Sequence, residues 1–385
     1  MSYNEKLYKI ISNNNYHKFQ KLIEKKFDFT QSITMYGENA LHLSCSHLNT
    51  KMVNYLLNVA KLNPNKCDIH GDTPLHHVCL SRNAYNKPNN KHIDIINMLI
   101  KVGAHVNVRD NRGLTPLDNA MEINRVDIVK LLYENGADIL YIYDNGCTYL
   151  HMATRQQSGE LMEYFLSLNQ PCPNNQSCPN NQSCPNNQSC QDDQTSPNDL
   201  TCPNKQPNKL FDPNSRDNKG RTALHIAVQN GFTKVIEVLL RYNANVSSVD
   251  NNSETPLFYL TYNANDTIQL LLKAGADINA RNILGRTPLH NAVIHSDKDV
   301  VKLLLHYIPS VNTVDNFNET PLHKACATKQ VEVVRSLVKC HANVFAFDEK
   351  NRYPFDLAKG NREIINILKS SSNLSFFDKI YLMMY

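Results

Sequence analysis

The sequence lacks the features that mark membrane, secreted and strongly charged proteins. Nowhere do eighteen apolar residues occur together, and residues 1–15 contain no apolar run followed by a cleavage signal. Neither a membrane-spanning helix nor a signal peptide is therefore predicted. The 40 Lys and Arg residues nearly balance the 36 Asp and Glu residues, so the formal net charge is only +4. This weak charge does not indicate nucleic acid or an acidic membrane surface as a partner.

Motifs of catalysis are missing as well. The sequence has no Gly-rich phosphate loop, no nucleophile elbow and no paired acids on a predicted strand. Its eleven cysteines are interpreted as reduced thiols of an intracellular chain. We therefore expect no enzyme activity, no catalytic residue and no cofactor. We expect a cytoplasmic monomer, with the nucleus left open as a second compartment.

Glycine is scarce, at 12 residues, whereas asparagine is very frequent and clusters, as at residues 13–15. This bias is typical of an AT-rich genome, such as that of a virus or a parasite. In that case the compartment would be the host cytoplasm.

One short phrase recurs along the chain. Its central Leu or Phe lies at positions 41, 75, 117, 150, 224, 257, 289, 322 and 355. Most successive spacings are 32 to 34 residues, and the two exceptions, 42 and 74, exceed a period of 33 by 9 and 41 residues. A fixed period of this length indicates a repeat array. The two exceptions predict one insertion near residues 82–90 and another over residues 170–210.

Each residue of the phrase has a local role. Residues 71–76 read Gly-Asp-Thr-Pro-Leu-His and residues 285–290 read Gly-Arg-Thr-Pro-Leu-His. Thr can cap a helix, Pro suits the first helical position, and Leu then points inward. A second amphipathic run follows, as at residues 126–132, and a Gly such as Gly136 ends it. Each unit is predicted to be turn, helix, loop, helix, which makes the fold all-α.

The Thr-Pro-Leu-His phrase at this period resembles the ankyrin repeat family. The resemblance implies an L-shaped solenoid of stacked helix-loop-helix units with hairpin-like fingers and a concave binding face, with about nine repeats plus an N-terminal cap. A single unit cannot bury its apolar faces alone, so terminal units are expected to differ. The expected divisions are capping helices at 1–36, repeats at 37–169, the insertion at 170–210, repeats at 211–369 and an apolar tail at 370–385.

Some units depart from the pattern. Ser253, Asn318 and Asn351 stand where the turn Gly is expected, and Phe258 stands where His is expected. Asn tolerates the positive φ that Gly supplies, and Ser tolerates it less well. The unit around Ser253 is also one residue short, so we expect an irregular structure there.

Six histidines occupy the same place in the phrase. Their spacing of one repeat is too wide for them to share one metal ion. The resemblance implies instead that each bonds the backbone of the adjacent turn. The segment 42–47 mixes His and Cys, but no second pair completes a zinc set, so no metal site is predicted. The six are His42, His76, His151, His225, His290 and His323.

Three segments outside the regular repeats remain. Residues 172–189 repeat Cys-Pro-Asn-Asn-Gln-Ser three times, which favours a disordered loop over a Cys-rich metal or redox loop. The shorter insertion carries Tyr85 and would project at the rim of the binding face, where contact with a partner is one interpretation. The tail at 370–385 either packs on the last repeat as a cap or docks another protein.

The predicted function is an intracellular scaffold or adaptor that binds a protein partner on the concave face. The alternative is a substrate-recruiting or regulatory subunit of an enzyme complex such as a ubiquitin ligase, including a viral or pathogen factor that acts on the host. Family positions mapped one by one give these candidate contacts: Arg281, Ile283, Leu284 and Arg286 in one finger, Asn316, Phe317 and Glu319 in the next, and Tyr262 after an inner helix. Tyr85 in the shorter insertion is a further candidate. Apolar groups at solvent-facing turn tips have no core to pack into, and aromatic and Arg side chains commonly dominate binding energy.

Overall fold

The computed structural model describes residues 3–81, 90–169, 211–261 and 264–370. Over these ranges it contains nineteen α-helices, one 3₁₀ element and no strand, which confirms the predicted all-α class. The described residues fall into two compact units, residues 3–141 and residues 142–370. Within these ranges no helix is both long and apolar enough to cross a bilayer.

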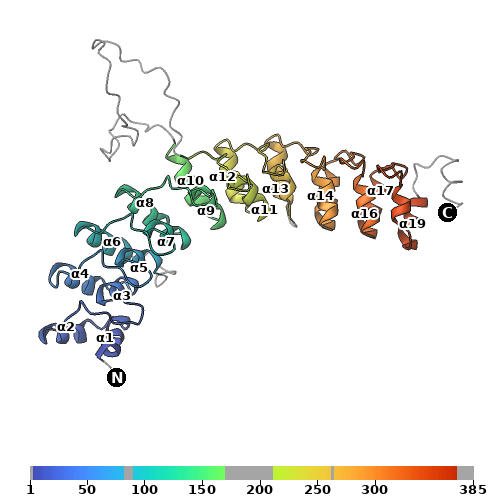
Figure 1. Cartoon of the computed structure of the whole chain (residues 1–385). Helices are drawn as coiled ribbons and strands as arrows, with labels where there is room; N and C mark the ends of the chain where they lie inside the picture. The colour runs from blue at the N-terminus through green and yellow to red at the C-terminus, as the bar shows by residue number, and fades with distance from the viewer. Residues whose placement is uncertain (1–2, 82–89, 170–210, 262–263, 371–385) are drawn as a thin grey trace, which may run out of the picture. The chain divides into compact units, whose positions relative to one another are not determined.

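The first unit consists of four helix pairs. Figure 1 shows the pairs succeeding one another along the chain, and α3 packs against α5, which in turn packs against α7. The helices are α1 (Tyr3–Ser12), α2 (Tyr16–Glu24), α3 (Ala40–Ser46), α4 (Thr50–Asn58), α5 (Pro74–Leu80), α6 (Lys91–Lys101), α7 (Pro116–Glu122) and α8 (Val126–Glu134).

The second unit continues the same pattern with six pairs, one of which has a 3₁₀ element as its first member. The pairs are α9 (Tyr149–Arg155) and α10 (Gly159–Ser167), α11 (Ala223–Gln229) and α12 (Thr233–Arg241), η1 (Pro256–Tyr259) and α13 (Asn265–Lys273), α14 (Pro288–Ile294) and α15 (Lys298–His306), α16 (Pro321–Ala327) and α17 (Val331–Lys339), and α18 (Pro354–Leu357) and α19 (Arg362–Lys369). With α1 and α2 set apart as the N-terminal pair, nine pairs remain among the described residues, as the repeat count predicts.

The recurring phrase starts the first helix of a pair by capping it. At α14, Thr287 has extended backbone (φ −95°, ψ 168°) and Pro288 occupies the first turn. The backbone N–H of Thr287 donates to Nδ1 of His290 at 3.2 Å, and Leu289 is fully buried behind the cap. The N–H of His290 in turn donates to Oγ1 of Thr287 at 3.5 Å. The phrase itself thus satisfies both backbone donors, which explains why the helix begins sharply at this residue.

The six phrase histidines link each repeat to the turn of the next repeat, as the resemblance implies. Each Nε2 donates to a backbone carbonyl of the following turn at 2.9 to 3.2 Å. Burial lowers the pKa of His42 and of His290 to about 4, so both imidazoles are neutral at physiological pH. These histidines are therefore structural donors, and the prediction that they play this role is confirmed.

The irregular repeat is the one around Ser253, as the sequence predicts. Ser253 adopts a positive φ of 58°, and the first helix of this pair is shortened to the four-residue 3₁₀ element η1. The shortened element leaves a hollow of about 340 Å³ beside α14. Asn318 and Asn351 also adopt positive φ, at 54° and 56°, in place of the expected Gly.

Several predicted features lie outside the described residues. They are the insertion over residues 170–210, most of the shorter insertion with Tyr85, Tyr262, and the tail from residue 371 onward.

Candidate functional site

Consecutive turns in the second unit are joined through their backbones. The N–H of Asn316 donates to the carbonyl of Leu284 at 2.9 Å, and the N–H of Glu349 donates to the carbonyl of Phe317 at 3.2 Å. These bonds hold each turn beside the next, so Leu284 and Phe317 are neighbours one repeat apart. We name these turns the fingers, at residues 281–286, 314–319 and 347–352.

Apolar side chains stand exposed on the three fingers. Ile283 is 59% exposed, Leu284 38% and Phe317 46%, in the places predicted for partner contact. Phe347 on the third finger is 59% exposed and is absent from the contacts predicted from the sequence, which stop at the second finger. The signal was available, because Phe347 precedes Asp348 in the same way that Arg281 precedes Asn282 at the first finger.

Two predicted contact residues brace the fingers. The guanidinium of Arg281 donates to the carbonyl of Gly285 at 3.1 Å and to the carbonyl of Val314 in the next finger at 2.8 Å. The side-chain amide of Asn316 donates to the carbonyl of Ile283 at 3.1 Å. Both side chains therefore connect the first finger to the second.

Arg286 and Glu319 belong to a charged cluster at the base of the same fingers. The cluster centres on Asp315, whose side chain is fully buried and lies 3.5 Å from Nε of Arg286 and 3.2 Å from Nζ of Lys324. Nζ of Lys324 also pairs with Glu319, and Arg352 lies 3.9 Å from that carboxylate. The two predicted residues thus hold partners within the chain.

The charge state of Asp315 follows from these contacts. Burial opposes its ionisation, but hydrogen bonds from the N–H groups of Glu319 and Phe317, together with Lys324, lower the pKa of this carboxyl. Asp315 is therefore ionised at neutral pH, and the ammonium of Lys324 compensates it. The cluster therefore stabilises the base of the second finger.

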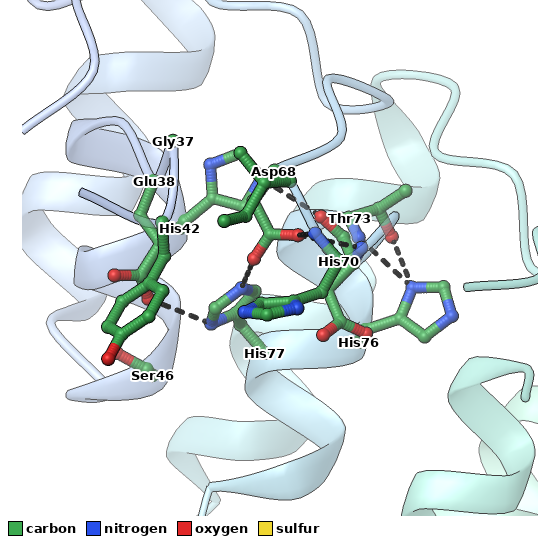
Figure 2. A network of polar contacts seen from close by, with 12 residues as sticks. Gly37, Glu38, His42, Ser46, Asp68, His70, Thr73, His76 and His77 are labelled. Atoms are coloured by element: carbon green, nitrogen blue, oxygen red, sulfur yellow. Dashed lines mark hydrogen bonds and ion pairs between the residues drawn. The ribbon is translucent and has the colours of Figure 1, made fainter. Parts of the chain in front are cut away.

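A related cluster occupies the first unit, at the turn before α5. Figure 2 shows His77 between Asp68 and Glu38: Nε2 of His77 lies 3.1 Å from Oδ2 of Asp68, and Nδ1 lies 3.7 Å from Oε1 of Glu38. One donor atom from each of Asp68, Asp72 and His77 lies within 4.8 Å of the others. These are ligand atoms of a kind that divalent metals accept, and the sequence argument, which considered cysteine and histidine spacings, did not find them.

Asp72 has an unusual environment in this cluster. Its Oδ1 is buried and has no hydrogen-bond partner among the described residues. Burial raises the pKa of Asp72, while the neighbouring His76 and His77 oppose that rise. An unpaired buried carboxylate oxygen beside a second carboxylate is unfavourable unless a positive charge approaches it.

Comparison with known proteins bears on the whole chain. A family model described as ankyrin repeats (3 copies) matches five stretches, at residues 7–88, 84–177, 200–282, 262–348 and 289–376. Together these stretches cover well over half of the chain.

Three individual relatives are each less than 30% identical to this chain. The mouse B-cell lymphoma 3 protein homolog is 27% identical over 59% of this chain and 42% of its own length. Ankyrin repeat protein OPG189 of variola virus is 26% identical over 68% of this chain and 40% of its own. The E3 ubiquitin-protein ligase KEG of Arabidopsis thaliana is 26% identical over 66% of this chain and 18% of its own.

The matched part is thus less than half the length of each of these three relatives. The family model, in contrast, matches most of this chain, and the capped helix pairs follow one another at the period found in the sequence. The chain therefore belongs to the ankyrin repeat family.

Proposed function

We propose that this chain is an adaptor that holds an apolar segment of a protein partner on the fingers of its second unit. Ankyrin repeats indicate protein–protein interaction, and the exposed finger tips support a binding surface at this place. The observation that carries the proposal is the row of exposed apolar side chains, Ile283, Leu284, Phe317 and Phe347, on three successive fingers. Large apolar patches that stay exposed on a protein surface are typical of association sites, and this row supports such a site here.

The fingers are suited to this role because they are already rigid. Arg281 and Asn316 tie the first finger to the second, and Lys324 fixes the base of the second through Asp315. A surface that is ordered before binding loses little conformational entropy when a partner arrives. In this proposal the apolar tips contact the partner, while Arg281, Arg286, Asn316 and Glu319 hold the tips in place. We place the adaptor in the cytoplasm as a monomer.

The test uses a double variant, L284A with F317A, in the full chain. Binding of the natural partner, identified by affinity capture and mass spectrometry, should weaken by roughly 2 kcal/mol, as for central interface residues. The melting temperature should change little, because both side chains are exposed.

The matched control is I308A. Ile308 is 87% exposed in the same unit, but it follows the outer helix α15 and lies on no finger. Its replacement should leave binding unchanged. Equal binding by wild type and by a double variant that melts normally would place the functional surface elsewhere.

The alternative function is a substrate-recruiting subunit of an enzyme complex. It is favoured by the similarity to a plant E3 ubiquitin-protein ligase and to a viral ankyrin repeat protein. The same capture experiment separates the two functions. Recruitment would be supported by two results together. Ligase components should be captured by both wild type and the double variant, whereas a second partner should be captured by wild type alone.

A further inference from the structure

Turns of different repeats place three side chains at the same relative positions. In the second unit these are Asp315, Glu319 four residues later, and Lys324 nine residues later on α16. In the first unit the equivalent residues are Asp68, Asp72 and His77 on α5. Because the backbone of the repeat is shared, these two sets can be compared position by position.

In the second unit both carboxylates of the set pair with its basic residue. Nζ of Lys324 lies 3.2 Å from Asp315 and also pairs with Glu319, so one ammonium sits between two carboxylates. Both carboxylates are largely buried, with side-chain exposures of 0% and 17%. When carboxylates occupy the positions of Asp315 and Glu319, a positive charge is therefore accommodated between them.

In the first unit the lysine is replaced by a histidine. An imidazole is shorter than a lysine side chain, and His77 reaches Asp68 but leaves Oδ1 of Asp72 without a partner. Asp72 and His77 also line a pocket of about 260 Å³, together with Ser46, His47 and His76. The place that Lys324 fills in the second unit is thus lined here by two carboxylates and an imidazole nitrogen.

We propose that Asp68, Asp72 and His77 bind a divalent transition-metal ion, with zinc as the representative. An imidazole nitrogen with two carboxylate oxygens is a donor set that zinc accepts, and donor atoms within 4.8 Å of one another can converge on one ion with small side-chain rotations. The ion would supply the positive charge that the ammonium supplies at Lys324. Three protein ligands leave a coordination position for water or for a group of a partner bound in the pocket.

The donor set also selects the class of ion. Magnesium and calcium prefer oxygen ligands alone, whereas an imidazole ligand favours first-row transition ions. The proposal is independent of the partner surface on the fingers, because the two sites lie in different units. The failure of one would leave the other unaffected.

The experiment is isothermal titration of the full chain, freed of metal with a chelator, with zinc chloride. Wild type should bind about one zinc ion per chain that the variants D72N and H77K do not bind, or bind at least about ten-fold more weakly. Magnesium chloride at the same concentration should give no comparable binding.

The two variants are chosen to keep the fold. D72N retains the shape of the side chain, and H77K reproduces the set that Lys324 completes in the second unit, so both should melt at or above the wild-type temperature without metal. Zinc should raise the melting temperature of wild type more than that of either variant. No zinc binding by wild type would overturn the proposal, and so would equal binding by wild type, D72N and H77K, because the ion would then be held by other residues of the chain.

Discussion

The turn at residues 68–77 and the turn at residues 315–324 share one backbone design but differ in their basic side chain. In both, Oδ1 of the first aspartate accepts two backbone N–H groups, at 2.8 to 3.0 Å. In both, a second carboxylate follows four residues later. The first turn then presents an imidazole and the second an ammonium. The repeat therefore fixes where the groups stand, and the residue at the last position decides their chemistry.

A third turn supports this view. At Asp250, Glu254 and Tyr259 the last position holds a phenol, whose O–H donates to Oδ2 of Asp250 at 2.8 Å. Burial and the neighbouring carboxylates raise the pKa of Tyr259, so it remains a neutral donor. One position on the first helix of a repeat can thus carry a cation, an imidazole or a phenol without altering the turn.

The largest effect should come from removing the ammonium. K324M leaves Asp315 and Glu319 close together at a largely buried site, where Arg286 lies 3.5 Å from Asp315 and Arg352 lies 3.9 Å from Glu319. We expect the free energy of unfolding to fall by about 3 kcal/mol, the lower end for a broken buried pair. H77M should cost only about 1 kcal/mol, because it removes a single hydrogen bond.

Urea unfolding followed by helical circular dichroism, in buffer with a chelator, measures both variants. R335M is the control, since Arg335 pairs with Glu363 at the surface, where such pairs contribute little. Equal losses for K324M and H77M would mean that the two turns are not distinguished by their basic residue.

Much of the fold could be predicted from the sequence because its causes are local. The Thr-Pro pair starts the first helical element of several repeats, the phrase histidine bonds the next turn, and the short repeat around Ser253 is irregular for lack of a residue. Each of these features depends on residues a few positions apart or on the fixed period of the repeat. A single sequence contains that information.

The candidate sites were less predictable because their contacts cross between repeats. Arg281 reaches a carbonyl of the next finger, and its sequence position alone does not show whether the guanidinium is engaged or available. Asp68 and Asp72 look like ordinary turn residues, and only the structure brings them to His77. The equivalent position of Lys324 then indicates that a cation would fit between these side chains.

A smaller effect, of opposite sign in the two turns, should follow from neutralising the second carboxylate. D72N replaces a carboxylate whose Oδ1 is buried without a hydrogen-bond partner among the described residues, so the unfolding free energy should rise by about 1 kcal/mol in metal-free buffer. E319Q removes a charge that Lys324 compensates, and the unfolding free energy should fall by about 1 kcal/mol. Urea unfolding of both variants beside wild type measures the signs. Losses in both would show that Asp72 has a partner in solution, such as a water molecule or an ion.

The pH dependence of the D72N gain isolates the ionisation of Asp72. Burial raises the pKa of Asp72 above its ordinary value of 3.8. A raised pKa favours the folded protein fully below the unfolded value, and this advantage is lost as the pH rises through the folded value. Asparagine does not titrate, so the gain from D72N should be largest near neutral pH and should shrink as the pH falls toward about 4.

Urea unfolding of wild type and D72N, from about pH 7 down to the lowest pH at which both are folded, gives the difference directly, and carboxylates common to both proteins cancel. Zinc near neutral pH should act in the opposite direction, because an ion bound by the two carboxylates and His77 stabilises wild type alone. A gain that stays constant at every pH would mean that it comes from the new amide, for example from a hydrogen bond that the amide donates, rather than from the loss of the charge. The first turn would then need no cation, and its likeness to the turn at Lys324 would end at the backbone.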